Sequence, residues 1–432
     1  MNIKQLKAKP SSDGFKYSKI WWLGFGFLGV QLAFTLYNAF LPLMYREFID
    51  SRALIGLLMG TDNLIGLILI PIIGAWSDRV NSKLGRRLPF IIVAIPFAAL
   101  TFFAIPFAAQ VLWTLIIVEV LFTTAIHIYR GPVISLMPDH TPPQKRSAAN
   151  GIINLMGGIG TLIAFGGLSL LYDIDPRIPF GVGAIVLPIT LVIVWLKADR
   201  QPPYIDNSPV TKTNPIKDTF AGIKVLTKKE NRGQLLIFLA MFTYFIGYAG
   251  LDAMFPIYGV ETLGLTEGQA AFVLTTFAGS FLISALFAGF VGTKWGKIPT
   301  MSLGLLIVPM LFLLAIPVRS TTIIGIIFVF AGFGWSLINV QAMPLIADLG
   351  GRDRVGFFIG LYYVFTMTGQ MIGPFVLGSA MDLVGNSGMF IAGAIVYLLG
   401  FVLLIQGRKR LGYDPQELAQ QTHLEHITNG VT

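Results

Sequence analysis

Long apolar segments separated by short polar ones recur along the whole chain. A run of about 20 apolar residues is long enough to cross the hydrocarbon core of a bilayer as an α-helix. The alternation with a period of two that marks an outer-membrane barrel is absent. The pattern therefore predicts an all-α membrane protein with twelve transmembrane helices. The predicted spans are residues 20–44, 53–77, 88–109, 111–137, 148–171, 179–197, 233–259, 268–291, 299–317, 321–347, 355–381 and 388–407.

Basic residues are unevenly distributed between the two sides of these predicted spans. If the N-terminus is cytoplasmic, the inner side contains the N-terminal lysines, most basic loops and the C-terminal cluster Arg408–Arg410. Inner loops of membrane proteins are enriched in Lys and Arg. The distribution predicts a multi-pass protein of the cell membrane, surrounded by lipid, with both termini cytoplasmic. The outer side contains only Arg46, Arg52, Arg177 and Arg319.

The amino-acid composition and the loop sequences exclude several classes of function. The net charge of +9 is explained by these topology signals, so we expect no nucleic-acid partner. The chain has no cysteine, which excludes disulfides, Cys-ligated zinc and thiol chemistry. The loops contain no metal-ligand cluster, nucleophile elbow or phosphate-binding loop. We therefore expect a protein that is not an enzyme and that needs neither a metal nor a cofactor.

The longest hydrophilic stretch between spans, residues 198–232, divides the spans into two sets of six. Within it, Asn214-Pro215 could begin a short helix on the membrane surface or belong to a plain linker. The predicted organisation is an N-terminal six-helix bundle at 1–197, a cytoplasmic central loop at 198–232, a C-terminal six-helix bundle at 233–410 and a cytoplasmic tail at 411–432.

Two motifs of the first half recur in the second half at an offset of about 210 residues. Lys83-Leu-Gly-Arg-Arg-Leu-Pro89 returns in shortened form as Lys294-Trp-Gly-Lys-Ile-Pro299. Leu136-Met-Pro-Asp139 returns as Leu345-Ile-Ala-Asp348. In each half an arginine follows the second motif, Arg146 or Arg354. Repeated halves are typical of transporters that bind substrate near the middle of the membrane.

The loop Gly74–Phe90 carries the strongest family signal, through Ser77-Asp78-Arg79 and Gly85-Arg86-Arg87 followed by Pro89. It resembles the loop between helices 2 and 3 of major facilitator superfamily transporters. Its sequence is similar to that of the sucrose/proton symporter branch, and the glycoside–pentoside–hexuronide cation symporters are more distant relatives. The resemblance implies two pseudo-symmetric six-helix bundles. It assigns gating of the cytoplasmic side to Asp78, Arg79, Gly85, Arg86, Arg87, Asp139, Arg146, Asp348 and Arg354.

Ionisable residues inside the predicted spans are candidates for proton coupling. A charge within a membrane costs about 3 kcal/mol on insertion scales, so each one suggests a function. Asp62 is the first candidate, because a carboxyl group in dry surroundings can load and release a proton. Glu119 and Asp252 are further proton candidates. Asp62 could instead only pair with a neighbouring helix, and Asp252 could accept hydrogen bonds from substrate.

The substrate candidates combine a guanidinium group, an aromatic ring and amides. Arg130 shares a helical face with Glu119, and it lies one turn before Ile134, where the plant sucrose carriers place an essential arginine. His127 is a weaker candidate in the same span. Trp335 and Asn339 could form a platform for a sugar ring, although Trp335 could simply pack in the core. The remaining polar candidates are Gln31, Tyr37, Asn38, Gln341 and Gln370.

Together these features predict a monomeric secondary transporter that takes up a di- or oligosaccharide, of the maltose or sucrose type, by alternating access. We expect protons rather than sodium as the coupling cation, because no span contains a close acidic pair that could cage sodium. Three alternatives remain open. They are a sodium-coupled glycoside symporter, an efflux carrier of the same fold and a sugar sensor that does not transport.

Overall fold

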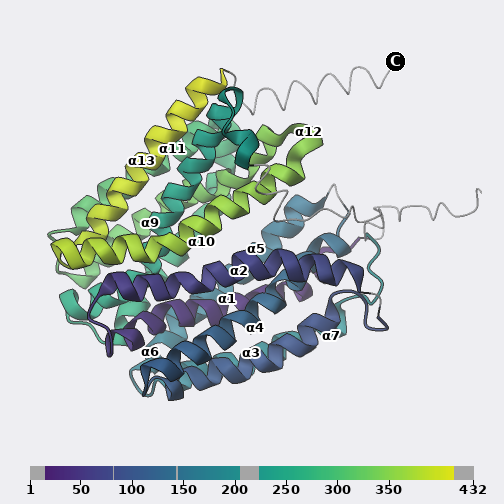
Figure 1. The fold of residues 1–432 in the computed structure, drawn as a ribbon, viewed down its shortest axis with the longest axis horizontal. Coiled ribbons are helices and arrows are strands. Elements are labelled where there is room, and N and C mark those ends of the chain that lie inside the picture. The colour runs from purple at the N-terminus through teal and green to yellow at the C-terminus, as the bar shows by residue number, and fades with distance from the viewer. Residues whose placement is uncertain (1–14, 81, 143–144, 205–222, 413–432) are drawn as a thin grey trace, which may run out of the picture. The chain divides into compact units, whose positions relative to one another are not determined.

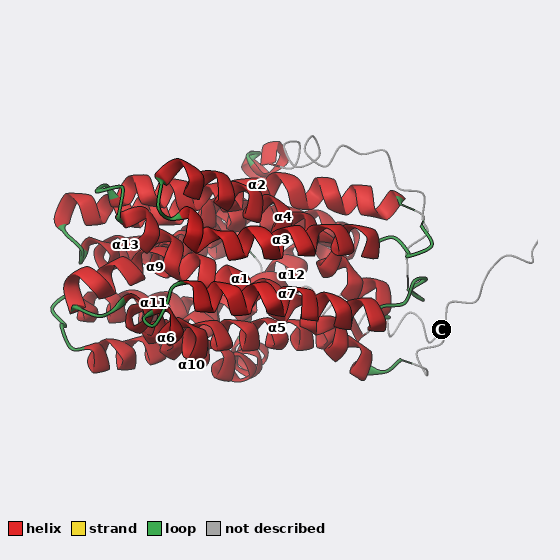
Figure 2. Ribbon diagram, turned by 90° about the horizontal axis from the view of Figure 1, so that it is seen from below, coloured by secondary structure: helices red, strands yellow, loops and turns green. Residues whose placement is uncertain are grey.

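The computed structural model describes residues 15–80, 82–142, 145–204 and 223–412. The predicted start of a helix at Asn214-Pro215 and nearly all of the predicted tail lie outside the described residues. The described part consists of helices joined by short turns and loops, as Figure 2 shows. The helices are α1 (Tyr17–Arg46), α2 (Arg52–Arg79), α3 (Leu88–Ala108), α4 (Leu112–His140), α5 (Arg146–Ile163), a π-helical turn (Ala164–Leu168), α6 (Ser169–Tyr172), α7 (Arg177–Lys197), a 3-10 turn (Lys229–Asn231), α9 (Arg232–Leu263), α10 (Glu267–Trp295), α11 (Lys297–Ala315), α12 (Thr321–Val384) and α13 (Gly388–Leu411).

Within the described residues, 11 helices are long and apolar enough to cross a membrane. Many contain internal prolines, such as Pro42 in α1 and Pro71 in α2. Such prolines are tolerated in membrane helices because neighbouring helices and side chains satisfy the freed backbone groups. Turn chemistry defines several ends. Thr266 caps α10 in a capping box with Gln269, and Gly264 adopts a left-handed conformation directly after α9.

Helix α12 differs from the sequence prediction. We predicted a loop at 348–354, but helical backbone continues through all 64 residues of α12. No proline follows Pro344 in this region to end the helix. A Cβ atom added at Gly350 would lie only 3.0 Å from the Cα atom of Val355. Five residues of straight helix rise about 7.5 Å. The helix therefore bends sharply here, and its two arms cover two predicted spans.

Packing divides the chain into two compact units. Unit 1 comprises Met1–Tyr37 and Ile68–Lys212, and unit 2 comprises Asn38–Leu67 and Thr213–Thr432. In unit 1, α3 packs against α4 and α7; in unit 2, α9 packs against α12 and α13 (Figure 1). The end of α1 and the first half of α2 thus group with the C-terminal helices.

Glycines allow close helix packing inside unit 2. Cβ atoms added at Gly369 and Gly373 of α12 would lie 2.5 Å from the carbonyl oxygens of Phe242 and Ile246 in α9. Small residues let membrane helices approach each other to backbone contact. The structural role of these two glycines is therefore close packing of α12 on α9.

Candidate functional site

A buried arginine organises the loop between α2 and α3 in unit 1. The Arg87 guanidinium binds Asp139 at the end of α4 with an Nε–Oδ2 distance of 2.9 Å. It also binds Asp78 at the end of α2, at 2.5 Å, and donates to the Ser77 hydroxyl. Burial lowers the pKa of Arg87, but the hydrogen bond and charge of Asp139, helped by Asp78, outweigh it and raise the pKa above its ordinary value. The sequence motif thus places one cation between two helix ends.

Unit 2 repeats this arrangement in simpler form. Lys297, at the start of α11, forms an ion pair with Asp348 of α12. The preceding glycines match as well, because Gly85 and Gly296 have φ angles of +85° and +93°, a region that favours glycine. A Cβ atom at Gly85 would also collide with the carbonyl oxygen of Arg200. The repeat seen in the sequence therefore corresponds to a repeated ion pair.

The other predicted gating residues have different surroundings. Arg146 donates to the carbonyl oxygens of Pro138 and Thr141, at 3.3 and 3.4 Å, and so caps the end of α4. Arg86 is half-buried, whereas Arg79 and Arg354 are exposed. Among the described residues, neither Arg79 nor Arg354 forms an ion pair with the acids that bind Arg87 and Lys297.

A polar and aromatic cluster lies between α1 and α4 in unit 1. The Tyr37 hydroxyl donates to Glu119 Oε1 at 2.8 Å, and both side chains are fully buried. The Phe34 ring lies 5.4 Å from the His127 ring, and the Arg130 guanidinium lies over Phe34 at 5.3 Å from its centroid. The structure therefore brings Glu119 and Arg130 to the face of α4 that contacts α1, as the helical spacing predicted, and His127 lies on the same face. We call these five residues the α1–α4 cluster.

Three other positions discussed for substrate or proton binding lie elsewhere. Asp62 is buried in α2 and belongs to unit 2. Gln31 lies against α5, where a Cβ atom added at Gly157 would lie 3.1 Å from Gln31 Cγ. Ile134, at the position of the family arginine, is 37% exposed, so it does not contribute to the buried face of α4 that holds Glu119.

A carboxylate and an aromatic stack lie side by side on α9 in unit 2. The Asn38 amide donates to Asp252 Oδ2 at 3.1 Å. One turn earlier, Tyr248 stacks on Trp335 with ring centroids 4.5 Å apart and an interplanar angle of 2°. Phe245 meets the same tryptophan edge-on at 5.5 Å. Trp335 itself is only 3% exposed. We call Asn38, Asp252, Tyr248 and Trp335 the α9 face.

The remaining predicted amides differ in availability. Gln341 is buried and donates to the carbonyl oxygen of Ala288 in α10 at 2.7 Å. Gln370 makes a long bond of 3.4 Å to Thr366 in its own helix. Asn339 is half-buried and makes no hydrogen bond to another described residue. Asn339 could therefore bind a ligand without first losing a hydrogen bond to a described residue.

A second charged network lies at the other ends of the helices in unit 2. Glu261 of α9 binds Arg46 at 2.6 Å and Arg52 at 2.5 Å. Asp382 of α12 accepts hydrogen bonds from the backbone N–H groups of Arg52 and Ala53 at 3.0 and 2.9 Å. We call Arg46, Arg52, Glu261 and Asp382 the outer charge cluster, because the charge pattern predicts that these helix ends are outside. The cluster attaches the segment 38–67 to α9 and α12.

In the part of the chain that the structure describes, no group of three or more His, Cys, Asp or Glu side chains could hold a metal ion. Asp252 is bound by an amide, Glu119 by a hydroxyl group, and Glu261 by basic side chains.

Comparison with protein families gives a clear match. The family model of the Major Facilitator Superfamily matches residues 23–339 and 237–425. The chain belongs to the Major Facilitator Superfamily. Its solved relatives agree in fold: a bacterial homologue of the human lysosomal transporter Spinster, in an inward-facing and unoccupied conformation, has a TM-score of 0.65 and 18% identity, covering 96% of this chain and 99% of that one.

Individual relatives of this superfamily member fall into two groups. Multidrug resistance protein 1 of Bacillus subtilis is 24% identical over 88% of this chain and 92% of its own length. Quinolone resistance protein NorA of Staphylococcus aureus is 24% identical over 91% of this chain and 96% of its own length. The sucrose transport protein SUC3 of Arabidopsis thaliana is 27% identical, but over only 32% of this chain and 27% of its own length.

Sequence reasoning missed three contributors to the sites of this Major Facilitator Superfamily transporter. Tyr248 could have been found from its position one turn before Asp252, which places both on one face of α9. Glu261 and Asp382 could have been found as acidic residues at predicted outer helix ends, on the same side as Arg46 and Arg52. All three lie in helices with many aromatic or polar residues, and the sequence alone does not distinguish them from their neighbours.

Proposed function

We propose that this transporter exports amphipathic organic cations in exchange for protons. The α9 face carries the proposal, since it places the carboxylate of Asp252 one turn from the stacked rings of Tyr248 and Trp335. A planar cation can pair with the carboxylate and pack its apolar surface on aromatic rings. The resistance proteins that match nearly the full chain support this reading, because export is how a transporter would protect a cell from a toxic compound.

Proton coupling would use the buried acids Asp252, Glu119 and Asp62. Charge inside a membrane is costly, so a carboxylate that loses its hydrogen-bond partner or a bound cation gains from taking up a proton. Asp252 has an amide partner and Glu119 a tyrosine partner, and each bond can be exchanged for a proton. A cation leaving Asp252 on the outside would thus be replaced by a proton that travels inward.

Alternating access would move the two units relative to one another around the substrate, as repeat-built transporters do. The Arg87 and Lys297 ion pairs would act on the cytoplasmic side, and the outer charge cluster would act on the opposite side. Each of these ion pairs lies inside one unit, so breaking it in one state and remaking it in another would also require a change of packing within that unit.

Proton-coupled uptake of a di- or oligosaccharide is the second candidate. Two observations favour it: the similarity of the loop Gly74–Phe90 to that of sucrose/proton symporters, and the partial match to SUC3. In that case Trp335 and Asn339 would bind the sugar ring and its hydroxyls, and Arg130 would bind further hydroxyls. The short match and the absence of the family arginine at Ile134 make this the weaker candidate.

Transport by purified protein in liposomes separates the two candidates. With an acidic interior, we expect a planar fluorescent cation such as ethidium to accumulate inside, and a protonophore to abolish the accumulation. Asp252→Asn should abolish proton-driven accumulation, whereas Asp50→Asn, an exposed carboxylate, should not. Uptake of labelled sucrose or maltose under an inwardly directed proton gradient, with no movement of the cation, would replace export by sugar symport. If a sodium gradient drives transport and a proton gradient does not, sodium is the coupling ion.

A further inference from the structure

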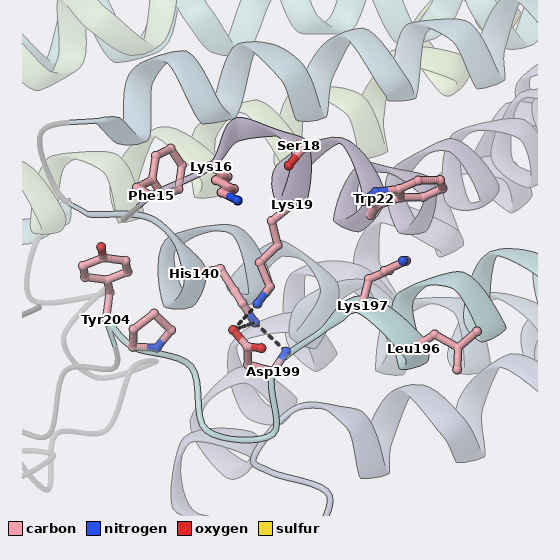
Figure 3. A pocket seen from close by; sticks show the side chains of 11 residues that line it. Phe15, Lys16, Ser18, Lys19, Trp22, His140, Leu196, Lys197, Asp199 and Tyr204 are labelled. Carbon is pink, nitrogen blue, oxygen red and sulfur yellow. Dashed lines mark hydrogen bonds and ion pairs between the residues drawn. The ribbon is translucent and has the colours of Figure 1, made fainter. Parts of the chain in front are cut away.

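The start of α1, the end of α7 and the end of α4 surround a cavity of about 490 Å³ in unit 1. Figure 3 shows the side chains that line it. Lys16 and Lys19 come from the start of α1, Lys197 from the end of α7, and Asp199 and Tyr204 from the segment that follows. Cations from two separate parts of the chain therefore converge on one hollow.

The charge in this cavity is only partly neutralised. Lys19 is ion-paired with Asp199, and Lys197 lies over the Trp22 ring at 5.1 Å from its centroid. Neither Lys16 nor Lys197 forms an ion pair with another described residue. Two ammonium groups thus remain available for an anion. The hydroxyl groups of Ser18, from the start of α1, and Tyr204, from the segment after α7, add hydrogen-bond donors to the lining.

Two backbone hydrogen bonds hold the wall of the cavity in place. The Asp199 N–H donates to His140 Nε2 at 2.9 Å, while His140 Nδ1 lies 2.8 Å from the carbonyl oxygen of Leu136. This pairing fits the neutral imidazole with its proton on Nδ1. The Tyr204 N–H donates to the carbonyl oxygen of Asp139 at 3.1 Å. The segment after α7 is therefore fixed to the end of α4.

The rim of the cavity is suited to a membrane surface. Trp22 is 42% exposed and Leu196 is 64% exposed, beside the lysines. Trp21 and Trp195 are also exposed next to them. Tryptophans at helix ends lie at the depth of lipid headgroups, and basic residues there attract anionic lipids of the cytoplasmic leaflet. The charge pattern of the sequence predicts the same cytoplasmic side for this end of the bundle.

We propose that this cavity binds a phosphate group, supplied by the headgroup of an anionic phospholipid. Lys16 and Lys197 would contact the phosphate oxygens, Ser18 and Tyr204 would donate hydrogen bonds, and Trp22 with Leu196 would contact the first part of the acyl chains. A free phosphate could use the same lysines but would leave the apolar rim exposed to lipid. This site is separate from the transported cargo and does not depend on which cargo is carried.

Native mass spectrometry of the full-length protein tests this proposal. The protein is titrated with phosphatidylglycerol, with phosphatidylcholine or with inorganic phosphate. The double variant Lys16→Gln/Lys197→Gln is compared with Lys228→Gln/Lys409→Gln, which removes the same charge from exposed positions of unit 2. We expect phosphatidylglycerol to bind the wild type more tightly than phosphatidylcholine. Affinity should fall about fivefold for each cavity lysine removed and stay unchanged in the control variant.

His140→Leu adds a test that leaves every lysine in place. It removes the acceptor that fixes Asp199, so we expect weaker binding of phosphatidylglycerol with the net charge of the cavity unchanged. Binding of inorganic phosphate that depends on the same lysines would support a phosphate site with a soluble ligand. Equal binding of phosphatidylglycerol to the wild type and the cavity variant would overturn the proposal, as would the absence of any preference for the anionic lipid.

Discussion

Individual side chains decide the chemistry of this transporter, and Arg87 shows how strongly one residue can depend on its partners. It is 7% exposed and lies between Asp139 and Asp78, so both carboxylates are compensated by a single cation. Removing one partner of a buried ion pair leaves an uncompensated charge, which costs about 3–5 kcal/mol. A similar charge at the surface contributes little because water screens it.

We therefore expect Arg87→Leu to unfold at a markedly lower temperature than the wild type, with a loss of stability of about 3 kcal/mol. Arg79→Leu, a change of the same type at an exposed position of the same loop, should lose less than about 1 kcal/mol. Thermal unfolding in detergent, followed by intrinsic fluorescence, measures both. Equal losses for the two variants would mean that the buried ion pairs contribute no more than surface charge.

The raised pKa of Arg87 also predicts how this contribution depends on pH. A base whose pKa is higher in the folded state stabilises the protein fully at every pH below its ordinary pKa and loses this effect only as the pH rises through the folded value. The ordinary pKa of arginine already lies far above neutral. The stability difference between wild type and Arg87→Leu should therefore stay constant between about pH 6 and 9, with the same unfolding assay as the measurement.

The α9 face makes a separate prediction at the residue scale. Tyr248→Ala removes the ring that stacks on Trp335, and we expect it to weaken binding of a planar cation about tenfold. Tyr248→Phe keeps the ring and should stay within about twofold of the wild type. Phe357→Ala, an exposed ring on α12, serves as the control. Fluorescence titration of the cation measures all four proteins, and equal binding by the alanine and phenylalanine variants would exclude Tyr248 from the site.

At the scale of elements, the sequence predicted most of the helices because apolar length and the side preference of basic residues carry that information. It also predicted that α4 turns Glu119 and Arg130 to one face, since that follows from helical geometry alone. It failed at 348–354, where a sharp bend keeps helical hydrogen bonding and leaves no proline signal. The Tyr248–Trp335 stack and the outer charge cluster join distant helices, and such pairings are invisible to the periodicity of a single helix.

The outer charge cluster is the element-scale feature most open to experiment, because it attaches residues 38–67 to α9 and α12. Glu261→Gln removes the carboxylate shared by Arg46 and Arg52, so we expect this segment to separate from α9 more often. Cysteine is absent from the chain, so a single introduced cysteine can be labelled without background. At Met59, which is 3% exposed, labelling of Met59→Cys by a membrane-impermeant maleimide should become about fivefold faster.

Asp50→Asn is the matched control for this labelling experiment. Asp50 contacts only Arg46 among the outer charge cluster, at 3.3 Å, and its side chain is fully exposed. Its removal should leave the labelling rate of Met59→Cys unchanged. If Glu261→Gln and Asp50→Asn have the same effect, the bridging position of Glu261 does not hold the segment in place.

At the scale of the whole molecule, the two halves contain the same kind of ion pair at equivalent positions, and the ion pair is more extensive in unit 1. Unit 1 places a buried arginine between two acids, and unit 2 places one lysine against one acid, each after a glycine with positive φ. The offset between them is the repeat offset of the sequence. Each ion pair lies inside one unit, so movement of the two units as rigid bodies around a central substrate would leave both ion pairs intact.

Rigid-body exchange between two states predicts which distances change during transport. Spin labels on Lys83→Cys and Lys294→Cys measure a distance between unit 1 and unit 2, because each of these exposed lysines begins the repeated motif of its half. Labels on Lys294→Cys and Lys409→Cys measure a distance within unit 2. We expect the distance distribution of the first pair to shift when a transported cation is added or the pH is lowered, because substrate and proton should favour different states. The second pair should keep one distribution under all conditions, since both labels move with the same unit. A constant first pair, in protein shown to bind the cation, would mean that transport does not proceed by movement of the two units.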